Sequence, residues 1–155
     1  MSFRITGLSP AQFRHLFGLP DEALAAHGAR RCIADSKPGF PDRIEVRDVE
    51  PGESLLLLNY THQPAETPYR ASHAIFVREG AVQRYDRVDE IPEVLRLRLI
   101  SLRAFDERDE MIDGAVTDGA TLALAIAQMF ADPAARYLHA HYASRGCYAA
   151  RVDRA

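Results

Sequence analysis

The segment ESLLLLNY, residues 53–60, contains four consecutive leucines with no polar residue between them. A strand with one solvent-facing side alternates apolar and polar residues, so an unbroken apolar run indicates that both faces are covered. The preceding Pro51-Gly52 pair is typical of the two central positions of a type II turn. We therefore predict that Leu55–Tyr60 is a central strand of a sheet.

Further strands are predicted on both sides of this segment. They are Phe3–Thr6, Cys32–Ala34, Arg43–Val46, His73–Arg78, Ala81–Tyr85, Leu99–Phe105, Met111–Val116, Tyr137–Ala143 and Cys147–Val152. His73–Arg78 and Ala81–Tyr85 are expected to pair as a hairpin across Glu79-Gly80, and the last two strands form a C-terminal hairpin across Ser144-Arg145-Gly146. Most of the sheet is thus expected to be antiparallel.

The strongest helical pattern follows Asp118, which is typical of a helix N-cap. Apolar residues recur there at i, i+4, i+7 and i+8, namely Leu122, Ile126, Met129 and Phe130. We predict one long helix over about 119–131, buried widely against a face of the sheet, and short N-terminal helices after Ser9 and Pro20. The predicted fold is a single α+β domain spanning residues 1–155.

The composition is that of an ordinary globular protein. The 155 residues are 47% hydrophobic and 26% charged, and the net charge of -3 gives no electrostatic reason to expect nucleic acid or an anionic membrane as a partner. No secretory signal or membrane-spanning run is present in the sequence, which predicts a cytoplasmic protein. The usual phosphate-loop, dinucleotide, zincin and CxxC motifs are absent, so no cofactor is predicted.

Cys147 and His141 are the candidate catalytic residues, and the loop between them decides whether they meet. A three-residue loop with a left-handed Gly146 pairs Ala143 with Cys147 and places Cys147 and His141 on one face. A two-residue loop places them on opposite faces, because a slip of one residue inverts the pattern. The glycine at the third loop position favours the shared face. The alternative role for Cys147 is that of a small buried apolar residue.

His139 and His141 are two residues apart in a predicted strand and therefore point to the same face. Two imidazoles at this spacing can share a metal ion if His62 or His73 supplies a third ligand. No second paired motif supports a metal, so the favoured interpretation is that both histidines fill the sheet. We predict no metal site and keep His139 and His141 as the candidates for one.

Residues 61–72 contain two prolines and are predicted to form a long loop, which is more often functional than idle. Its Tyr69 and Arg70 are candidates to hold an anionic ligand, together with Arg43 and Arg145, which stand beside proline or glycine. The predicted function is binding of a small, anionic molecule between the 61–72 loop and the 137–152 hairpin, with a Cys/His-based activity as an extension. The alternative is a non-catalytic interaction module or a homodimer.

Three stretches resemble a known family. They are PGE at 51–53 with the leucines that follow, PYRAS at 68–72, and GCYAAR at 146–151 together with His141. They resemble an uncharacterised bacterial family, domain of unknown function 1203, over nearly the whole chain. The resemblance implies a single-domain protein of this size, with no assigned activity and no catalytic residues to carry over.

Overall fold

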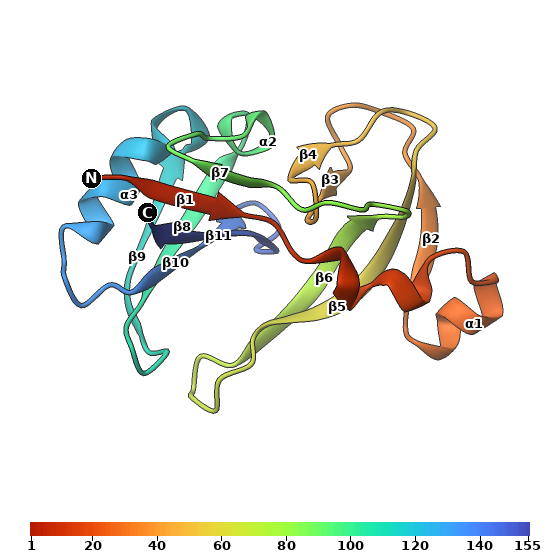
Figure 1. Cartoon of the computed structure of the whole chain (residues 1–155), viewed down its shortest axis with the longest axis horizontal. Helices are drawn as coiled ribbons and strands as arrows, with labels where there is room; N and C mark the ends of the chain where they lie inside the picture. The colour runs from red at the N-terminus through yellow and green to blue at the C-terminus, as the bar shows by residue number, and fades with distance from the viewer.

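The computed structural model describes residues 1–155 and contains two β-sheets with short helices around them (Figure 1). The protein is therefore α+β, and every strand pair is antiparallel except β3 with β6. The prediction of one sheet is wrong, because strands that follow one another along the chain divide between two sheets. No helix combines the length and the apolar character needed to cross a membrane.

Sheet A has six strands in the order β7-β1-β11-β10-β8-β9 and lies on the left of Figure 1. Its strands are β1 (Phe3–Thr6), β7 (Asp86–Val88), β8 (Leu99–Phe105), β9 (Met111–Asp118), β10 (Tyr137–Tyr142) and β11 (Tyr148–Arg154). The short helix α2 (Glu93–Arg96) and the helix α3 (Leu122–Phe130) belong to this half. Their apolar residues and those of sheet A form the larger hydrophobic core.

Sheet B has five strands in the order β2-β5-β6-β3-β4. Its strands are β2 (Arg30–Ile33), β3 (Pro41–Asp42), β4 (Arg47–Asp48), β5 (Ser54–Gln63) and β6 (Ala71–Arg78). Two 3-10 turns, Pro10–Gln12 and Arg14–Leu16, and the helix α1 (Asp21–Ala26) pack on it and form a second core. The prediction of a central strand is confirmed, since β5 pairs with β2 on one side and β6 on the other and buries Leu55 and Leu56 completely.

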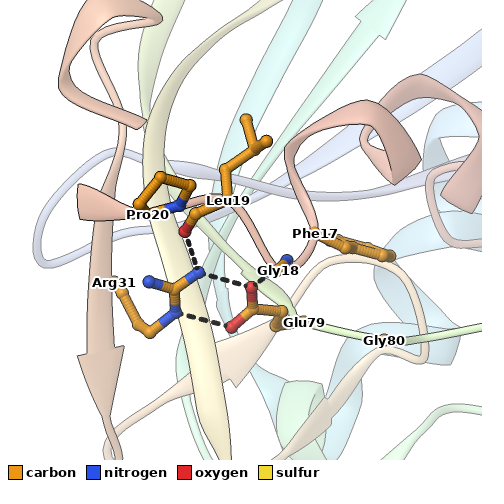
Figure 2. Close-up of a pocket in the computed structure, with 7 residues that line it drawn as sticks. All are labelled: Phe17, Gly18, Leu19, Pro20, Arg31, Glu79 and Gly80. Carbon is orange, nitrogen blue, oxygen red and sulfur yellow. Dashed lines mark hydrogen bonds and ion pairs between the residues drawn. The ribbon is translucent and has the colours of Figure 1, made fainter. Parts of the chain in front are cut away.

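The predicted hairpin between His73–Arg78 and Ala81–Tyr85 is wrong. Residues 81–85 are not a strand, and the chain crosses to sheet A, where β7 pairs with β1. The corner is fixed by the Glu79 carboxylate, which accepts hydrogen bonds from the Arg31 guanidinium and from Gly18 N (Figure 2). Because Glu79 is anchored to Arg31 of β2 and to the loop at Gly18, the chain turns away there instead of folding back.

The helix predicted over 119–131 is shorter than expected. Residues 119–121 form a 3-10 turn held by a hydrogen bond from Gly119 N to Arg98 O, and α3 itself has nine residues. Its buried positions follow one stripe, Leu122, Ala125, Ile126, Met129 and Phe130. Leu124 on the other side is 61% exposed, so the expectation of wide burial is wrong.

Candidate functional site

The C-terminal hairpin is present, but its register differs from the predicted one. His141 lies opposite Tyr148, Ala140 lies opposite Ala150, and the register shifts between them at a bulge. Gly146 has the expected left-handed backbone, but its N–H donates to Tyr142 O at 2.8 Å, so the loop closes at Tyr142 and not at Ala143. His141 and Tyr148 therefore share one face, Tyr142 and Cys147 share the other, and the predicted common face for Cys147 and His141 is wrong.

Cys147 lines a cavity of about 430 Å³ between the two sheets, which we call the Cys147 pocket. Its polar lining residues are Arg43, His73, Arg98, Tyr142, Ser144, Arg145 and Cys147. Apolar groups from residues 39–41 and from β5 and β6 complete the wall, and no acidic side chain lines it. Three of the residues predicted for a ligand site, Arg43, Arg145 and Cys147, thus share one cavity.

Arg43 lies at the back of the Cys147 pocket and is 2% exposed. Its guanidinium donates to Tyr148 O at 2.8 Å, to Pro41 O and to the Cys147 Sγ at 3.0 Å. None of these acceptors is a carboxylate. A buried guanidinium without a counter-ion attracts an anion far more strongly than an exposed one, because water screens the charge so little.

The Tyr142 ring contacts two arginines of the pocket, Arg43 and Arg98. The Arg43 and Arg98 guanidiniums lie over its ring, 5.0 Å and 5.1 Å from the centroid. Its hydroxyl is buried and has no hydrogen-bond partner, and burial raises the pKa of the phenol to about 12. At neutral pH this hydroxyl is a free hydrogen-bond donor inside the protein.

Arg98 differs from Arg43 because it has a counter-ion. Its two terminal nitrogens donate to the two carboxylate oxygens of Asp48, at 2.8 Å and 2.6 Å. Arg145 is exposed in the hairpin loop and His73 is half-buried on β6, where its Nδ1 lies 2.8 Å from Ala74 O. The uncompensated charges of the pocket are therefore Arg43 at the back and Arg145 at the loop.

Tyr69 and Arg70 do not line the Cys147 pocket. The predicted loop over 61–72 is shorter, because β5 continues to Gln63 and β6 begins at Ala71. Cross-strand pairing extends the sheet into residues that the prolines alone suggested were irregular. Arg70 donates to Pro64 O at 2.6 Å within the remaining turn, and both side chains are exposed.

A second cavity of about 330 Å³ lies where the sequence predicted the ligand pocket, between residues 62–65 and the hairpin strands. Its lining residues are His62, Gln63, Pro64, Ala65, Asp109, Tyr137, His139 and Arg151. None of the predicted ligand-binding residues is among them. The residues predicted for the ligand site and the location predicted for it therefore belong to two different cavities, one on each face of the C-terminal hairpin.

His139 and His141 share a face, as predicted, and His62 from β5 packs against both. We call these three residues the histidine cluster; the His62 ring centroid lies 4.8 Å from that of His141 and 6.2 Å from that of His139. Burial is the main cause that lowers the pKa of His62 to about 4, of His139 to about 2 and of His141 to about 3. No three His, Cys, Asp or Glu side chains are grouped so as to hold a metal ion.

A third hollow, of about 720 Å³, is open and lies beside the Arg31–Glu79 ion pair (Figure 2). Its charged groups are already satisfied. Arg31 donates to Glu79 and to Leu19 O, and Glu79 also accepts from Ser54 Oγ. These contacts fix the corner of the chain, and they leave no free charge for a ligand.

Sequence reasoning missed Tyr142, Arg98 and His73 as lining residues of the Cys147 pocket. Arg98 follows an alternating apolar pattern that indicates a solvent-facing position, and only its pairing with Asp48 turns it inward. Tyr142 directly precedes the hairpin loop, so a correct register would have placed it beside Cys147. His73 reaches the pocket because β6 pairs with β5 and β3, which no local pattern specifies.

Comparison with known proteins gives one match. A family model described as a protein of unknown function, DUF1203, matches residues 39–154. No curated protein and no solved structure matches the chain. The matched range contains every residue of the Cys147 pocket and of the histidine cluster named above.

Proposed function

The chain belongs to the DUF1203 family, whose function is unknown, and we propose that it binds a small anionic molecule in the Cys147 pocket. The observation that carries the proposal is the buried Arg43 guanidinium, which has no carboxylate partner and faces a cavity without acidic side chains. An anion in the cavity supplies the missing counter-charge.

The other polar groups of the pocket support the same ligand class. The Tyr142 hydroxyl is an unused donor, and an oxyanion accepts hydrogen bonds from phenols and guanidiniums alike. Arg145 stands in the hairpin loop, where an exposed charge steers an anion toward the cavity. A volume of about 430 Å³ is within the range of pockets that bind small molecules.

Cys147 is the reactive group that such a ligand would meet. Its sulfur accepts a hydrogen bond from Arg43 at 3.0 Å, so a potential nucleophile lies directly beside the buried guanidinium. His141 is on the opposite face of the hairpin and takes no part in this proposal. Binding is the proposed function, with Cys147 as its chemical reporter.

Two alkylating reagents of nearly equal size test the proposal. Iodoacetate carries a negative charge and iodoacetamide is neutral, so their relative rates at one thiol report the local potential. We expect the iodoacetate-to-iodoacetamide rate ratio to be about tenfold higher at Cys147 than at Cys32, which corresponds to about 1.4 kcal/mol of electrostatic attraction. Peptide mass spectrometry of the native protein measures both thiols in one sample. Equal ratios at the two thiols would refute an anion-selective pocket.

A pair of arginine variants localises the effect. Arg145→Gln is expected to lower the Cys147 ratio by about threefold, because it removes one exposed charge from the pocket entrance. Arg70→Gln is the matched control, since Arg70 is an exposed arginine in another turn and lines no part of the pocket. A loss of the same size in both variants would mean that overall charge, and not the pocket, sets the ratio.

A second candidate function, homodimerisation, rests on β9. It is the longest edge strand in the fold, paired with β8 on one side only, and its Val116 is 64% exposed. An open edge with apolar side chains favours pairing with another chain.

If β9 joins two copies, the wild-type chain is a dimer at tens of micromolar and Val116→Lys is a monomer. Light scattering after size-exclusion chromatography measures both masses. Val82→Lys is the control, because Val82 is 79% exposed and lies outside the strands. A monomeric wild-type chain excludes this function without affecting the proposal for the Cys147 pocket.

A further inference from the structure

The histidine cluster contains polar atoms that the fold does not satisfy. His62 Nδ1, His139 Nδ1 and His141 Nε2 are buried and have no hydrogen-bond partner. His139 is 4% exposed and His141 is 1% exposed. Folded proteins satisfy nearly all such atoms, so three together in one place point to an occupant.

The cluster borders the second cavity, which offers room for that occupant. His62 and His139 line its volume of about 330 Å³, and the His141 ring packs edge-on against His62. The cavity belongs to the face of the hairpin opposite Cys147, so the two pockets do not share their polar groups.

Cations flank the cluster on both sides. The register places Arg103 of β8 and Arg151 of β11 on either side of His139. Arg151 is paired with Asp153, whereas Arg103 forms no ion pair and donates a hydrogen bond to Ser101 Oγ at 3.3 Å. The half-buried Arg103 guanidinium therefore lacks a counter-ion beside the three imidazoles.

We propose that the histidine cluster is a second ligand site, independent of the Cys147 pocket, which takes a small oxyanion onto its imidazoles and the Arg103 guanidinium. The oxyanion neutralises Arg103 and accepts from imidazole N–H groups; at His141, whose Nδ1 donates to Gly146 O, the Nε2–H forms only when the ring is protonated. The shared chemistry is that of a sulfate, a phosphate or a phosphate ester.

Binding is expected to draw a proton onto the cluster. The imidazoles are kept neutral by burial and by Arg103, and an anion among them reverses that effect. The charged and titratable groups that the structure brings to this site are His73 of β6, Arg103 of β8, Asp109 of the β8–β9 turn, Tyr137 of β10, and Tyr148, Arg151 and Asp153 of β11. Of these, only His73 is a further imidazole, so it is the group that a variant has to separate from the cluster.

Sulfate is the probe, because its own charge is constant from about pH 5.5 to 7.5. Isothermal titration of the full chain in two buffers with different ionisation enthalpies measures both affinity and proton uptake. We expect sulfate to bind with uptake of a proton and with affinity that rises up to about tenfold per pH unit as the pH falls below 6.5. Binding without proton uptake would overturn the proposal, and so would the absence of binding.

Variants assign the signal to the cluster. His62→Asn and Arg103→Met are expected to remove the proton-linked binding, whereas His27→Asn, on α1's C-terminal side and outside the cluster, retains it. His73→Asn is expected to retain it too, which separates the cluster from the nearest other imidazole. Arg145→Gln alters only the Cys147 pocket, so a signal lost in Arg145→Gln but kept in His62→Asn would refute the second site alone. Saturable zinc binding that His62→Asn abolishes, without any response to sulfate, would replace the oxyanion with a metal.

Discussion

Replacing Gly7 with alanine is expected to unfold the protein or to lower its free energy of unfolding by more than about 4 kcal/mol. A Cβ at this position would lie 2.1 Å from Ile44 O and 2.9 Å from Val46 Cγ2. The two backbones cannot separate freely, because Gly7 N donates to Tyr85 O and Leu8 N donates to Arg43 O. Urea unfolding followed by circular dichroism measures the loss.

Gly114→Ala is the matched control for this variant. Gly114 lies in β9, and the nearest atom to an added Cβ is Leu102 O at 3.9 Å, an ordinary contact. We expect its stability to stay within about 0.5 kcal/mol of the wild type. A Gly7→Ala protein as stable as Gly114→Ala would show that the two sheets tolerate a wider separation. Because Leu8 N donates to Arg43 O beside this contact, such a protein would also show that the backbone of Arg43 can move.

Acidification from about pH 6.5 to 5 is expected to destabilise the fold by about 2 to 4 kcal/mol through the buried His139 and His141, and the half-buried His62 acts in the same direction. The pKa values of His139 and His141 are lowered to about 2 and about 3, so in this range the unfolded chain binds protons that the folded chain does not. Stability is therefore complete above the unfolded value of about 6.5 and falls as the pH decreases, by about 1.4 kcal/mol per unit for each histidine.

The range from about pH 6.5 to 5 separates the effect of the histidines on stability from that of the salt-bridged carboxylates. Salt-bridged Glu53 and Glu79 have pKa values lowered to about 2, and their stabilisation is lost only below about pH 4.5. Burial raises the pKa of Asp42, so acidification through that pKa adds stability from this group and opposes the effect of the histidines.

Urea unfolding at several pH values, in buffer without sulfate or phosphate, measures the slope. His139→Leu is expected to reduce it by about 1.4 kcal/mol per pH unit, since it removes one of the two buried imidazoles. His27→Leu is the control, because His27 is exposed beside α1. A wild-type slope near zero between pH 5 and 6.5 would contradict the burial of neutral imidazoles.

The parts of the fold that could be predicted are those set by neighbouring residues. The leucines of β5 specify burial on both faces wherever the strand is placed, and Gly146 specifies a tight loop. Pairing between distant segments could not be predicted. No strand was predicted over the residues of β7, and its partner β1 lies at the N-terminus, about 80 residues earlier in the sequence.

In the candidate site too, the features set by neighbouring residues could be predicted, and those set by pairing between distant segments could not. Arg43, Arg145 and Cys147 were selected from local features, and the structure brings them to one cavity. A left-handed Gly146 fits hairpin loops of different lengths. The length of the loop decides whether His141 lies on the same face as Cys147, and the sequence alone did not specify it. Tyr69 and Arg70 were selected because prolines suggested a long loop, whereas strand pairing shortened it. Their predicted ligand-binding role finds no support in the position of either side chain.

The register of β1 and β11, in which Phe3 lies opposite Arg154, also affects how the protein folds. The centre of sheet A joins segments far apart in sequence, and such contacts close large loops before they are stabilised. Refolding is then expected to be slow, on the order of milliseconds to seconds, and the contact between Cys147 and Arg43 joins residues 104 positions apart in the sequence. A thiol-reactive probe at Cys147 therefore reports the formation of this long-range contact during refolding as well as the occupancy of the pocket.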